Sequence, residues 1–488
     1  MFKKNDIYTA NITDMGTNGE GICRIDGYTL FVKDALPGDE VRLKITKANK
    51  NFGFAVIDEI IKPSPDRVEA VCPVASKCGG CRIQHLAYEK QLKYKENIVK
   101  NNLERIGRAE GFIMHNIIGM DNPYFYRNKA QYPVRRGKNG KIQMGFYAGR
   151  THSVIETEKC YIGIPENEEI LGIIKGHMEK FGIEPYDEES HSGLVRHVLI
   201  RKGVATGEIM VCIIINGYDL PEVDTLVKAL LAVRGMKDIS LNVNKDKGNV
   251  ILGKKVISIF GEGYITDMIG DVKFRISPLS FFQVNPAQTV KLYGKALEYA
   301  GLTGKETVWD LYCGIGTISL FLAKSAYEVK GVEIVPEAID DARNNAKING
   351  IDNVEFFAGK AEEVLPEYYM KRKTEGVDVI VVDPPRKGCD IRVCETIVKI
   401  MPERIVYVSC DSATLARDVK FFGENGYAVR EVQPVDMFPH TGGIETVCLL
   451  SKLHSDQHIE VELQMDELDL TAVESKATYE EIKDYALN

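Results

Sequence analysis

The sequence predicts a multidomain chain with three folded units: a small N-terminal β-barrel, a central α+β domain and a C-terminal α/β domain. Three observations support this division. Short strand-like segments separated by turn residues fill the first 62 residues, mixed strands and helices follow, and strands and helices alternate regularly from about residue 270. The 488 residues are also enough for several domains of about 100–200 residues each.

Composition and charge exclude several classes of protein. Hydrophobic residues make up 44% and charged residues 27%, which is ordinary for a soluble globular chain. No apolar run reaches the roughly 18–20 residues that span a bilayer, and the N-terminus lacks the apolar core of a secretion signal. The net charge is −8, but basic residues dominate the first 150 positions and acidic residues the last 35. We therefore expect a cytoplasmic protein, without membrane or obligate protein partners, whose N-terminal half can contact RNA.

Residues 1–62 contain five short alternating segments separated by Gly, Asp and Asn clusters. This pattern favours a small closed barrel of the OB type. Residues 63–269 follow as the central α+β domain, with a helical pattern at 86–106 and strand patterns between 129 and 245.

Residues 270–453 alternate short, fully apolar strands with helical stretches, which indicates a doubly wound, mostly parallel sheet. A short Pro/Gly loop joins the last two strands, so we expect an antiparallel edge. Residues 454–488 form an acidic extension with a helical pattern near its end, for which the sequence indicates no chemistry.

The ends of successive strands in the C-terminal domain carry motifs typical of a nucleoside-containing cofactor. Glycines within 310–317 (DLYCGIGT) let the backbone turn sharply beside a ligand. Glu333 ends the second strand, where it can accept hydrogen bonds from a ribose diol, and Asp383-Pro384-Pro385 ends the fourth. The glycines alone would also fit a dinucleotide, but the ordered set favours S-adenosylmethionine (SAM) over NAD.

The residues after this Asp-Pro-Pro turn count against two related chemistries. Amino-group methyltransferases place an aromatic residue after such a turn, whereas this chain continues with Arg386 and Lys387. RNA cytosine-C5 methyltransferases place a Pro-Cys pair there, and this chain has none.

A thiol and a carboxylate at the ends of two further strands favour methylation at C5 of uracil. Carbon 5 of uracil becomes a good nucleophile when a thiolate adds to C6, and Cys410 ends the fifth strand. The C5 proton must afterwards be removed by a general base, and Glu445 begins the last strand beside the same cleft. His440, in the preceding loop, could orient the base, contact RNA or pack the loop.

Four cysteines form a candidate metal site. Cys72, Cys78 and Cys81 lie within ten residues, and Cys160 can supply a fourth thiolate. Four thiolates suit a [4Fe–4S] cluster or a zinc ion, although zinc sites usually show paired C-x2-C motifs. Radical SAM enzymes use a C-x3-C-x2-C spacing that leaves one iron open, so the C-x5-C-x2-C spacing here favours a closed cluster that is structural or faces RNA.

Further residues could contact RNA or the methyl donor. Phe281 and Phe282 could stack on a base or pack a domain junction, and Gln283 could bind the donor or the backbone. A target uracil must lie in a loop or be flipped out of a stem. We expect the barrel to hold RNA phosphates together with a basic strip interleaved with tyrosines, consisting of Tyr126, Arg127, Lys129, Tyr132, Arg135, Arg136, Lys138 and Lys141.

Together these motifs resemble those of the RNA 5-methyluridine methyltransferases, in particular the iron–sulfur branch that acts on 23S ribosomal RNA. The resemblance extends from residue 1 to about 453 and runs through CPVASKCGGC, YRNKAQYPV, SPLSFFQVN, DLYCGIGT, DPPRKG, YVSC and DMFPHT. It implies that residues 1–62 form a TRAM domain and 270–453 a class I SAM-dependent methyltransferase fold.

The resemblance also implies roles for individual residues. Cys410 would be the nucleophile and Glu445 the base. The implied ligands are Gln283, Tyr312, Glu333 and Asp383 for SAM, and Cys72, Cys78, Cys81 and Cys160 for a [4Fe–4S] cluster. Two positions depart from the family pattern: Asp411-Ser412 replaces the usual Asn-Pro, and Gly443 stands where a histidine is frequent.

Three alternatives remain from the sequence. The same chemistry could act on tRNA, because the catalytic motifs do not encode the RNA. A non-catalytic iron–sulfur RNA-binding protein is the second alternative, against which the presence of both Cys410 and Glu445 counts. A radical methylthiotransferase shares the TRAM domain and SAM but does not match the cysteine spacing.

Overall fold

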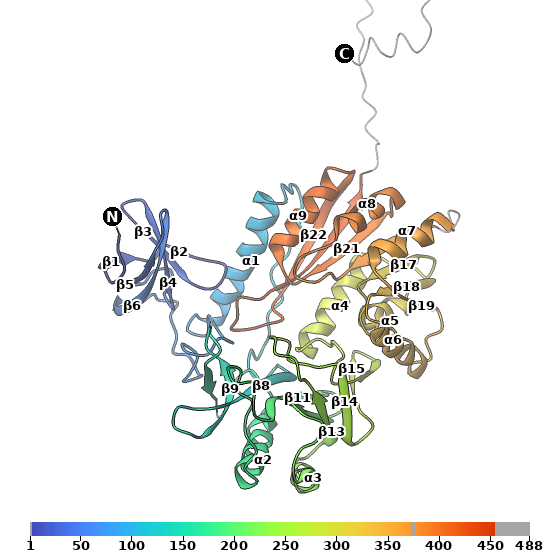
Figure 1. The fold of residues 1–488 in the computed structure, drawn as a ribbon. Coiled ribbons are helices and arrows are strands. Elements are labelled where there is room, and N and C mark those ends of the chain that lie inside the picture. Colours follow the sequence, from blue (N-terminus) through green and yellow to red (C-terminus); the bar gives the residue numbers. More distant parts are fainter. Residues whose placement is uncertain (1, 150, 158, 372–375, 454–488) are drawn as a thin grey trace, which may run out of the picture. The chain divides into compact units, whose positions relative to one another are not determined.

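The strands of the computed structural model form four sheets within the described residues, 2–149, 151–157, 159–371 and 376–453 (Figure 1). The chain through Lys452 is one compact unit. The acidic extension expected at 454–488 lies outside the described residues. None of the helices in the described part has the length and apolar character needed to cross a membrane.

The N-terminal sheet has six strands, one more than the sequence predicts. They are β1 (Ile7–Asn11), β2 (Asp14–Met15), β3 (Gly21–Ile25), β4 (Tyr28–Lys33), β5 (Glu40–Ala48) and β6 (Phe52–Lys62). Their order is β1-β5-β6-β4-β3-β2, and the sheet curls so that β1 also contacts β3. The added strand, β2, is only two residues long, too short for a periodic pattern to reveal. Inward-facing residues such as Leu30, Val32 and Leu43 form the core.

The central sheet has seven strands in the order β10-β9-β8-β11-β12-β13-β14. Its elements are β8 (Lys129–Arg136), β9 (Ile142–Tyr147), β10 (Val154–Glu156), α2 (Glu166–Lys180), β11 (Val195–Lys202), β12 (Ile209–Ile215), α3 (Val223–Leu230), β13 (Met236–Val243) and β14 (Lys255–Phe260). Every residue of β12 is buried. Alternate side chains explain this, since Val211 enters the core beneath α2 and α3 while Cys212 enters the core of the C-terminal part.

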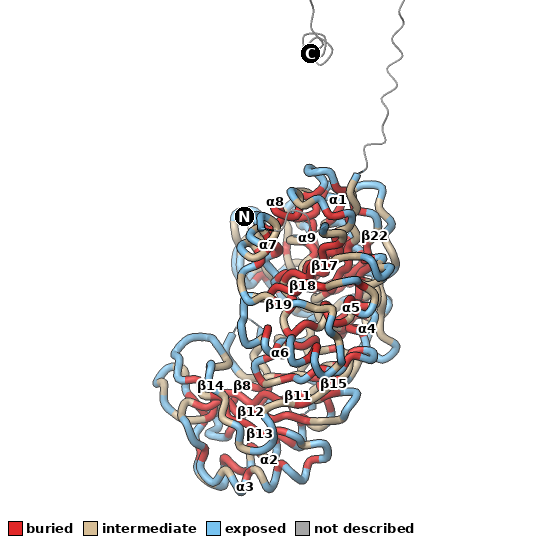
Figure 2. Tube along the Cα trace, turned by 90° about the vertical axis from the view of Figure 1, so that its right-hand side faces the viewer, coloured by how far each residue is buried: buried red, intermediate tan, exposed pale blue. Residues whose placement is uncertain are grey.

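The C-terminal part contains a hairpin and an eight-stranded sheet, whose strands are among the most buried of the chain (Figure 2). The elements are β15 (Ile265–Ile269), β16 (Val272–Ile276), α4 (Pro286–Ala300), β17 (Thr307–Leu311), α5 (Thr317–Ala323), β18 (Glu328–Glu333), α6 (Pro336–Ile348), β19 (Val354–Ala358), α7 (Ala361–Lys371), β20 (Val379–Val382), α8 (Ile391–Ile400), β21 (Arg404–Ser409), α9 (Ser412–Gly423), β22 (Tyr427–Val435) and β23 (Glu445–Lys452). Strands β19-β18-β17-β20-β21 are parallel, and β23 pairs antiparallel with both β21 and β22. The expected antiparallel pairing of the last two strands is confirmed.

One segment packs differently from the expected division into 63–269 and 270–453. Helix α1 (Tyr88–Arg105) packs against α9, and β7 (Ile113–Met114) pairs with β22 at the edge of the C-terminal sheet. Val99 and Leu103 of α1 share the core of that sheet. An amphipathic pattern shows that a helix has an apolar face but not which core the face covers.

Candidate active site

Cys410 and Glu445 meet where β21 ends and β23 begins. In the antiparallel register of these strands the last pair is Ser409 with Thr446. Cys410 directly follows Ser409 and Glu445 directly precedes Thr446, and the two side chains are close enough to interact electrostatically. Glu445 is only 3% exposed, whereas Cys410 is half-buried. Strand pairing therefore fixes the two groups that the sequence assigned as nucleophile and base.

Burial and neighbouring charges set the protonation of this pair. Burial raises the pKa of Cys410 to about 11, with further upward contributions from Glu445 and Asp383, while Arg386 acts in the opposite direction. Burial and the Asp383 carboxylate raise the pKa of Glu445 well above its usual range, again opposed by Arg386. Burial also raises the pKa of Asp383 to about 7. A cationic ligand placed here would favour the ionised forms of all three acids.

The turn after β17 forms a cradle beside these groups. Tyr312, Gly314 and Gly316 have φ values of 71°, 55° and 80°. The Gly314 N–H donates to Glu333 Oε2 (3.2 Å) and the Val335 N–H to Glu333 Oε1 (3.0 Å), which holds the Glu333 carboxylate at the end of β18. A Cβ at Gly314 would meet nothing within 4 Å, so the turn borders open space. These residues fit the nucleoside part of SAM.

Three groups near the site were not assigned a role from the sequence: Asp310, Tyr293 and Arg386. Asp310 accepts a 2.5 Å hydrogen bond from the Ser319 hydroxyl, and burial raises its pKa to about 7. Burial raises the pKa of Tyr293 on α4, with smaller upward contributions from the nearby Asp383, Asp310 and Glu445 carboxylates. Asp310 opens the DLYCGIGT motif and Arg386 follows the Asp-Pro-Pro turn, so both had a positional signal. Tyr293 lies in an ordinary amphipathic helix and had none.

In the segment before α4, the two aromatic residues considered for RNA contact have different environments. Phe282 is buried in the core, whereas Phe281 is 68% exposed. Gln283 is buried, and its carbonyl accepts a hydrogen bond from Asn128 Nδ2 (3.2 Å). This contact fixes the backbone of Gln283, and the role of its side chain as a SAM ligand stays a prediction.

The four candidate metal ligands lie close together around the segment 72–81. Burial and repulsion from Cys160, Cys78 and Cys72 raise the pKa of Cys81 to about 12. The Gly80 N–H points to Cys78 Sγ at 3.4 Å, the type of contact that stabilises a ligating thiolate. A Cβ at Gly79 would meet the Tyr147 carbonyl oxygen at 2.8 Å, so glycine allows this close wrapping. These residues fit a cluster held by thiolates.

The cysteine segment is fastened to the loop that leads into Glu445. The Arg82 and Ile83 N–H groups both donate to the His440 carbonyl oxygen, at 2.9 and 3.1 Å. The Tyr126 hydroxyl donates to the Pro439 carbonyl oxygen (3.1 Å). Burial raises the pKa of this hydroxyl well above its usual range, with smaller upward contributions from Cys81 and Cys160. The segment with the candidate metal ligands and the loop that leads to the candidate base are thus joined by hydrogen bonds.

His440 is buried within this loop. It has a φ of 67° and is 2% exposed, and its Nδ1 accepts from Gln91 Nε2 at 3.2 Å. Burial lowers its pKa to about 4, so the ring is neutral at pH 7. Of the three roles considered for His440, packing of the loop has the direct support of these contacts.

The basic strip expected between residues 126 and 141 is not a continuous RNA-facing surface. Tyr126, which precedes β8, and Tyr132 on β8 are 5% and 1% exposed, so neither ring can stack on a base. Arg135 pairs with Glu188, and Arg136 pairs with Glu184 at 2.6 Å. The tyrosine part of that expectation is wrong.

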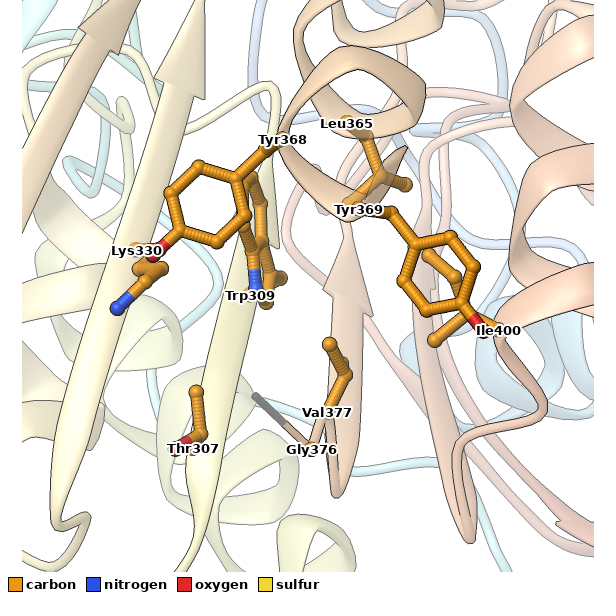
Figure 3. Close-up of a pocket in the computed structure, with 9 residues that line it drawn as sticks. All are labelled: Thr307, Trp309, Lys330, Leu365, Tyr368, Tyr369, Gly376, Val377 and Ile400. Carbon is orange, nitrogen blue, oxygen red and sulfur yellow. The ribbon is translucent and has the colours of Figure 1, made fainter. Parts of the chain in front are cut away.

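Two further features belong to the core. A cavity of about 10 Å³ lies beside Trp309 and Lys330, lined also by Tyr368 from α7 (Figure 3). It is about the size of one water molecule, too small for SAM. Among the described residues, Cys389, Cys394 and Asp418 also gather their donor atoms within 4.8 Å.

Asp418 is already engaged in this second group. Its carboxylate accepts hydrogen bonds from the Tyr407 hydroxyl (2.6 Å), the Cys389 N–H (2.9 Å) and Arg417 Nε (2.8 Å). The Arg417 guanidinium already balances the charge of the Asp418 carboxylate. The contacts of Asp418 therefore favour a structural role for this group, including Cys389 and Cys394.

Comparisons with known proteins point to one family. Residues 253–453 match the model of the tRNA (Uracil-5-)-methyltransferase family, and residues 2–57 match the TRAM domain. A protein from Halalkalibacterium halodurans, named as an uncharacterized RNA methyltransferase, is 50% identical over 450 residues, which is 92% of this chain and 97% of that protein. A similarly named protein from Clostridium acetobutylicum is 50% identical over 454 residues, 92% and 98% of the two chains.

A solved structure agrees with these matches. The Pyrococcus abyssi tRNA (uracil-54, C5)-methyltransferase in complex with S-adenosyl-L-homocysteine is 29% identical to this chain, with a TM-score of 0.74. The alignment covers 91% of this chain and 99% of that one. With a glycine turn and acidic strand ends that fit SAM, and with relatives matched over nearly their whole length, the chain belongs to the RNA uracil-5-methyltransferase family with an N-terminal TRAM domain.

Proposed function

We propose that this enzyme methylates C5 of a uridine in 23S rRNA and that Cys410 forms a temporary covalent bond to C6 of the target base. The observation that carries the proposal is the proximity of Cys410, directly after β21, to Glu445, the first residue of β23. The mechanism needs a nucleophile and a base within reach of the same ring, and this register supplies both groups.

The reaction balances with these two groups. The Cys410 thiolate adds to C6, and the electron pair of the C5–C6 double bond makes C5 nucleophilic. SAM supplies an electrophilic methyl group, which C5 takes while S-adenosylhomocysteine leaves. Glu445 then removes the C5 proton, the double bond re-forms and the sulfur leaves C6. The net products are 5-methyluridine, S-adenosylhomocysteine and a proton.

Electrostatics couple the donor to both catalytic groups. Cys410 must lose a proton before attack, and Glu445 must be ionised when it accepts one, yet both have raised pKa values. The Arg386 guanidinium lowers both pKa values, and a sulfonium bound beside Asp383 would lower them further. The protein would thus become reactive only when the methyl donor is bound.

Glu333, Tyr312, Asp383 and Gln283 are the proposed SAM ligands. The Glu333 carboxylate is already oriented by two backbone N–H groups and keeps lone pairs for a ribose diol. Asp383 ends β20 next to the reacting pair and would face the charged end of the donor.

We assign a [4Fe–4S] cluster to Cys72, Cys78, Cys81 and Cys160. A tetrahedral zinc ion with Zn–S bonds of about 2.3 Å would bring its ligand sulfurs to about 3.8 Å from one another. In the described part of the chain, Cys389, Cys394 and Asp418 alone gather three donor atoms within 4.8 Å. The four thiols are close enough to raise one another's pKa, and the Gly80 N–H faces Cys78 Sγ, which supports a site held by thiolates. Anaerobic purification should yield iron and sulfide in stoichiometric amounts, and a colourless protein with stoichiometric zinc would overturn the assignment.

A uridine in tRNA is the second candidate substrate. It is favoured by the solved Pyrococcus abyssi relative, whose name gives uracil-54 of tRNA as its target. The 23S rRNA assignment rests on the resemblance of the cysteine-containing sequence to the iron–sulfur branch of the family.

One experiment separates these substrates. RNA from a strain without the gene is fractionated into 23S rRNA and tRNA, incubated with purified protein and labelled SAM, and mapped for 5-methyluridine by mass spectrometry. Labelled 5-methyluridine in 23S rRNA supports the proposal, and label in tRNA alone supports the second candidate. No transfer to either fraction would overturn the proposed function.

A further inference from the structure

An aromatic groove crosses the outer face of the N-terminal sheet. Phe31 on β4 lies opposite Phe54 on β6, and Phe52 lies at the start of β6. The ring centroids of Phe31 and Phe54, and of Phe52 and Phe54, are 5.8 Å apart. These rings line a groove of about 540 Å³ together with Thr17 and Asn18.

The core does not require these three rings. Leu30 and Val32 on β4 and Ala55 on β6 point to the inner face and are buried, whereas Phe52 is 39% exposed. The solvent face of a sheet that is exposed on one side is normally polar. Three aromatic side chains gathered on such a face, with a hollow between them, indicate a binding site.

The flanking charges suit a nucleic acid. In the registers of the sheet, Lys47 on β5 lies opposite Phe54, and Arg24 on β3 lies opposite Thr29, which in turn lies opposite Phe52. Both Arg24 and Lys47 are exposed. Two cations thus lie in the strands next to the groove, whose lining also contains one acidic residue, Glu20. The cations can contact phosphates while the rings contact bases.

The groove borders the catalytic loop. A Cβ at Gly442 would lie 3.2 Å from the Thr17 carbonyl oxygen, and Arg82 donates to Asn18 Oδ1 at 2.9 Å. Gly442 is three residues from Glu445, at most about 11 Å along an extended chain. A base in the groove would therefore belong to a nucleotide close to the target uridine.

We propose that the groove formed by Phe31, Phe52 and Phe54 binds an unpaired nucleobase of the RNA strand that flanks the target. This inference rests on the proposed function and extends it, because it assigns the N-terminal domain a base-stacking site in addition to phosphate contacts. Stacking explains how one site can accept different flanking sequences, since every base offers an aromatic face.

Two probes test the groove by fluorescence anisotropy. One is a labelled oligouridylate of about twelve nucleotides, within the site sizes of OB-type folds, and the other is an abasic ribose-phosphate chain of the same length. Phe52→Leu keeps an apolar side chain of similar size but removes the ring. We expect it to weaken oligouridylate binding about five- to tenfold, with less than about a twofold change for the abasic chain. Phe52→Trp keeps an aromatic ring at this position and should bind oligouridylate about as tightly as the unchanged protein.

Two further variants serve as controls. Phe260→Leu removes an equally exposed ring (39%) from the central sheet and should change neither affinity. Lys47→Ala should weaken both probes and reduce the salt dependence of binding. Equal losses by Phe52→Leu on both probes, or no loss on either, would overturn the inference. If the protein methylates no RNA, the proposed function is overturned. The effect of Phe52→Leu on the two probes would still decide whether the groove binds a base.

Discussion

Lys95 Nζ lies 2.5 Å from Asp436 Oδ1, and neither side chain is exposed. Lys95 also donates to the Phe438 carbonyl oxygen (3.0 Å), and the Tyr88 hydroxyl donates to Asp436 Oδ2 (2.8 Å). This buried ion pair connects α1 to the loop between β22 and β23, which ends at Glu445. A residue far away in the sequence thereby holds the segment that carries the candidate base.

Lys95→Met should strongly destabilise the protein. The change leaves the Asp436 carboxylate buried without its cation, and breaking such a pair costs about 3–5 kcal/mol. Urea unfolding measures the loss. Lys100→Met on the same helix removes an exposed pair with Glu104 and should cost less than about 1 kcal/mol. Equal stability of the two variants would contradict the importance of the buried pair.

Cys410→Ala and Glu445→Gln should stop the reaction at different points. Without the thiol no addition to C6 occurs, so methyl transfer should fall below detection while the free energy of unfolding changes by only about 1 kcal/mol. In the Glu445→Gln variant the C5 proton stays in place, and a methylated protein–RNA adduct should accumulate and survive denaturing electrophoresis. The double variant should show no adduct. Normal turnover by Cys410→Ala would refute the covalent mechanism.

Arg386→Ala should move the pH dependence of catalysis. The Arg386 guanidinium lowers the pKa of Cys410, so its removal leaves less thiolate at any pH below that pKa. We expect kcat/KM to rise with pH in both proteins, with the variant curve displaced to higher pH. Lys387→Ala, which removes the neighbouring exposed cation, should leave the curve in place. If kcat/KM falls by the same factor at every pH and the curve is not displaced, Arg386 serves RNA binding instead.

The affinity for SAM should rise with pH up to about pH 7. Burial raises the pKa of Asp383 and Asp310 to about 7, so both are partly protonated in the ligand-free protein near neutrality. The sulfonium cation favours their ionised forms, so binding should release protons below pH 7. Calorimetry in buffers of different ionisation enthalpy measures this release. S-adenosylhomocysteine has no sulfonium charge and should release fewer protons, and equal release by both ligands would contradict the assignment.

The same raised pKa values have a consequence for folding. The folded protein binds these protons more tightly than the unfolded chain, so the stability due to Asp383 and Asp310 is present at acid pH and declines as pH rises from about 4 towards 7.

Strand ends were well predicted from the sequence, but contacts between distant segments were not. The alternation of apolar strands and helices predicted the parallel sheet, and the motifs after successive strands placed Glu333, Asp383 and Cys410 at one edge of it. The Lys95–Asp436 pair joins residues 341 positions apart and leaves no periodic signal. Tyr126 and Tyr132 were wrongly predicted to contact RNA, because their position among basic residues does not reveal that both rings are buried.

Tyr126→Phe should show whether the cysteine site positions the catalytic loop. The change removes only the hydroxyl that donates to Pro439. Tyr132→Phe is a matched control, because the Tyr132 hydroxyl is buried near the same cysteines and has no hydrogen-bond partner among the described residues. We expect Tyr126→Phe to keep its iron content and SAM affinity but to lower kcat and speed amide exchange over residues 436–445. Cys81→Ser should lose iron and show the same faster exchange. If Cys81→Ser loses its iron while exchange in that loop stays unchanged, the cysteine site does not support the loop.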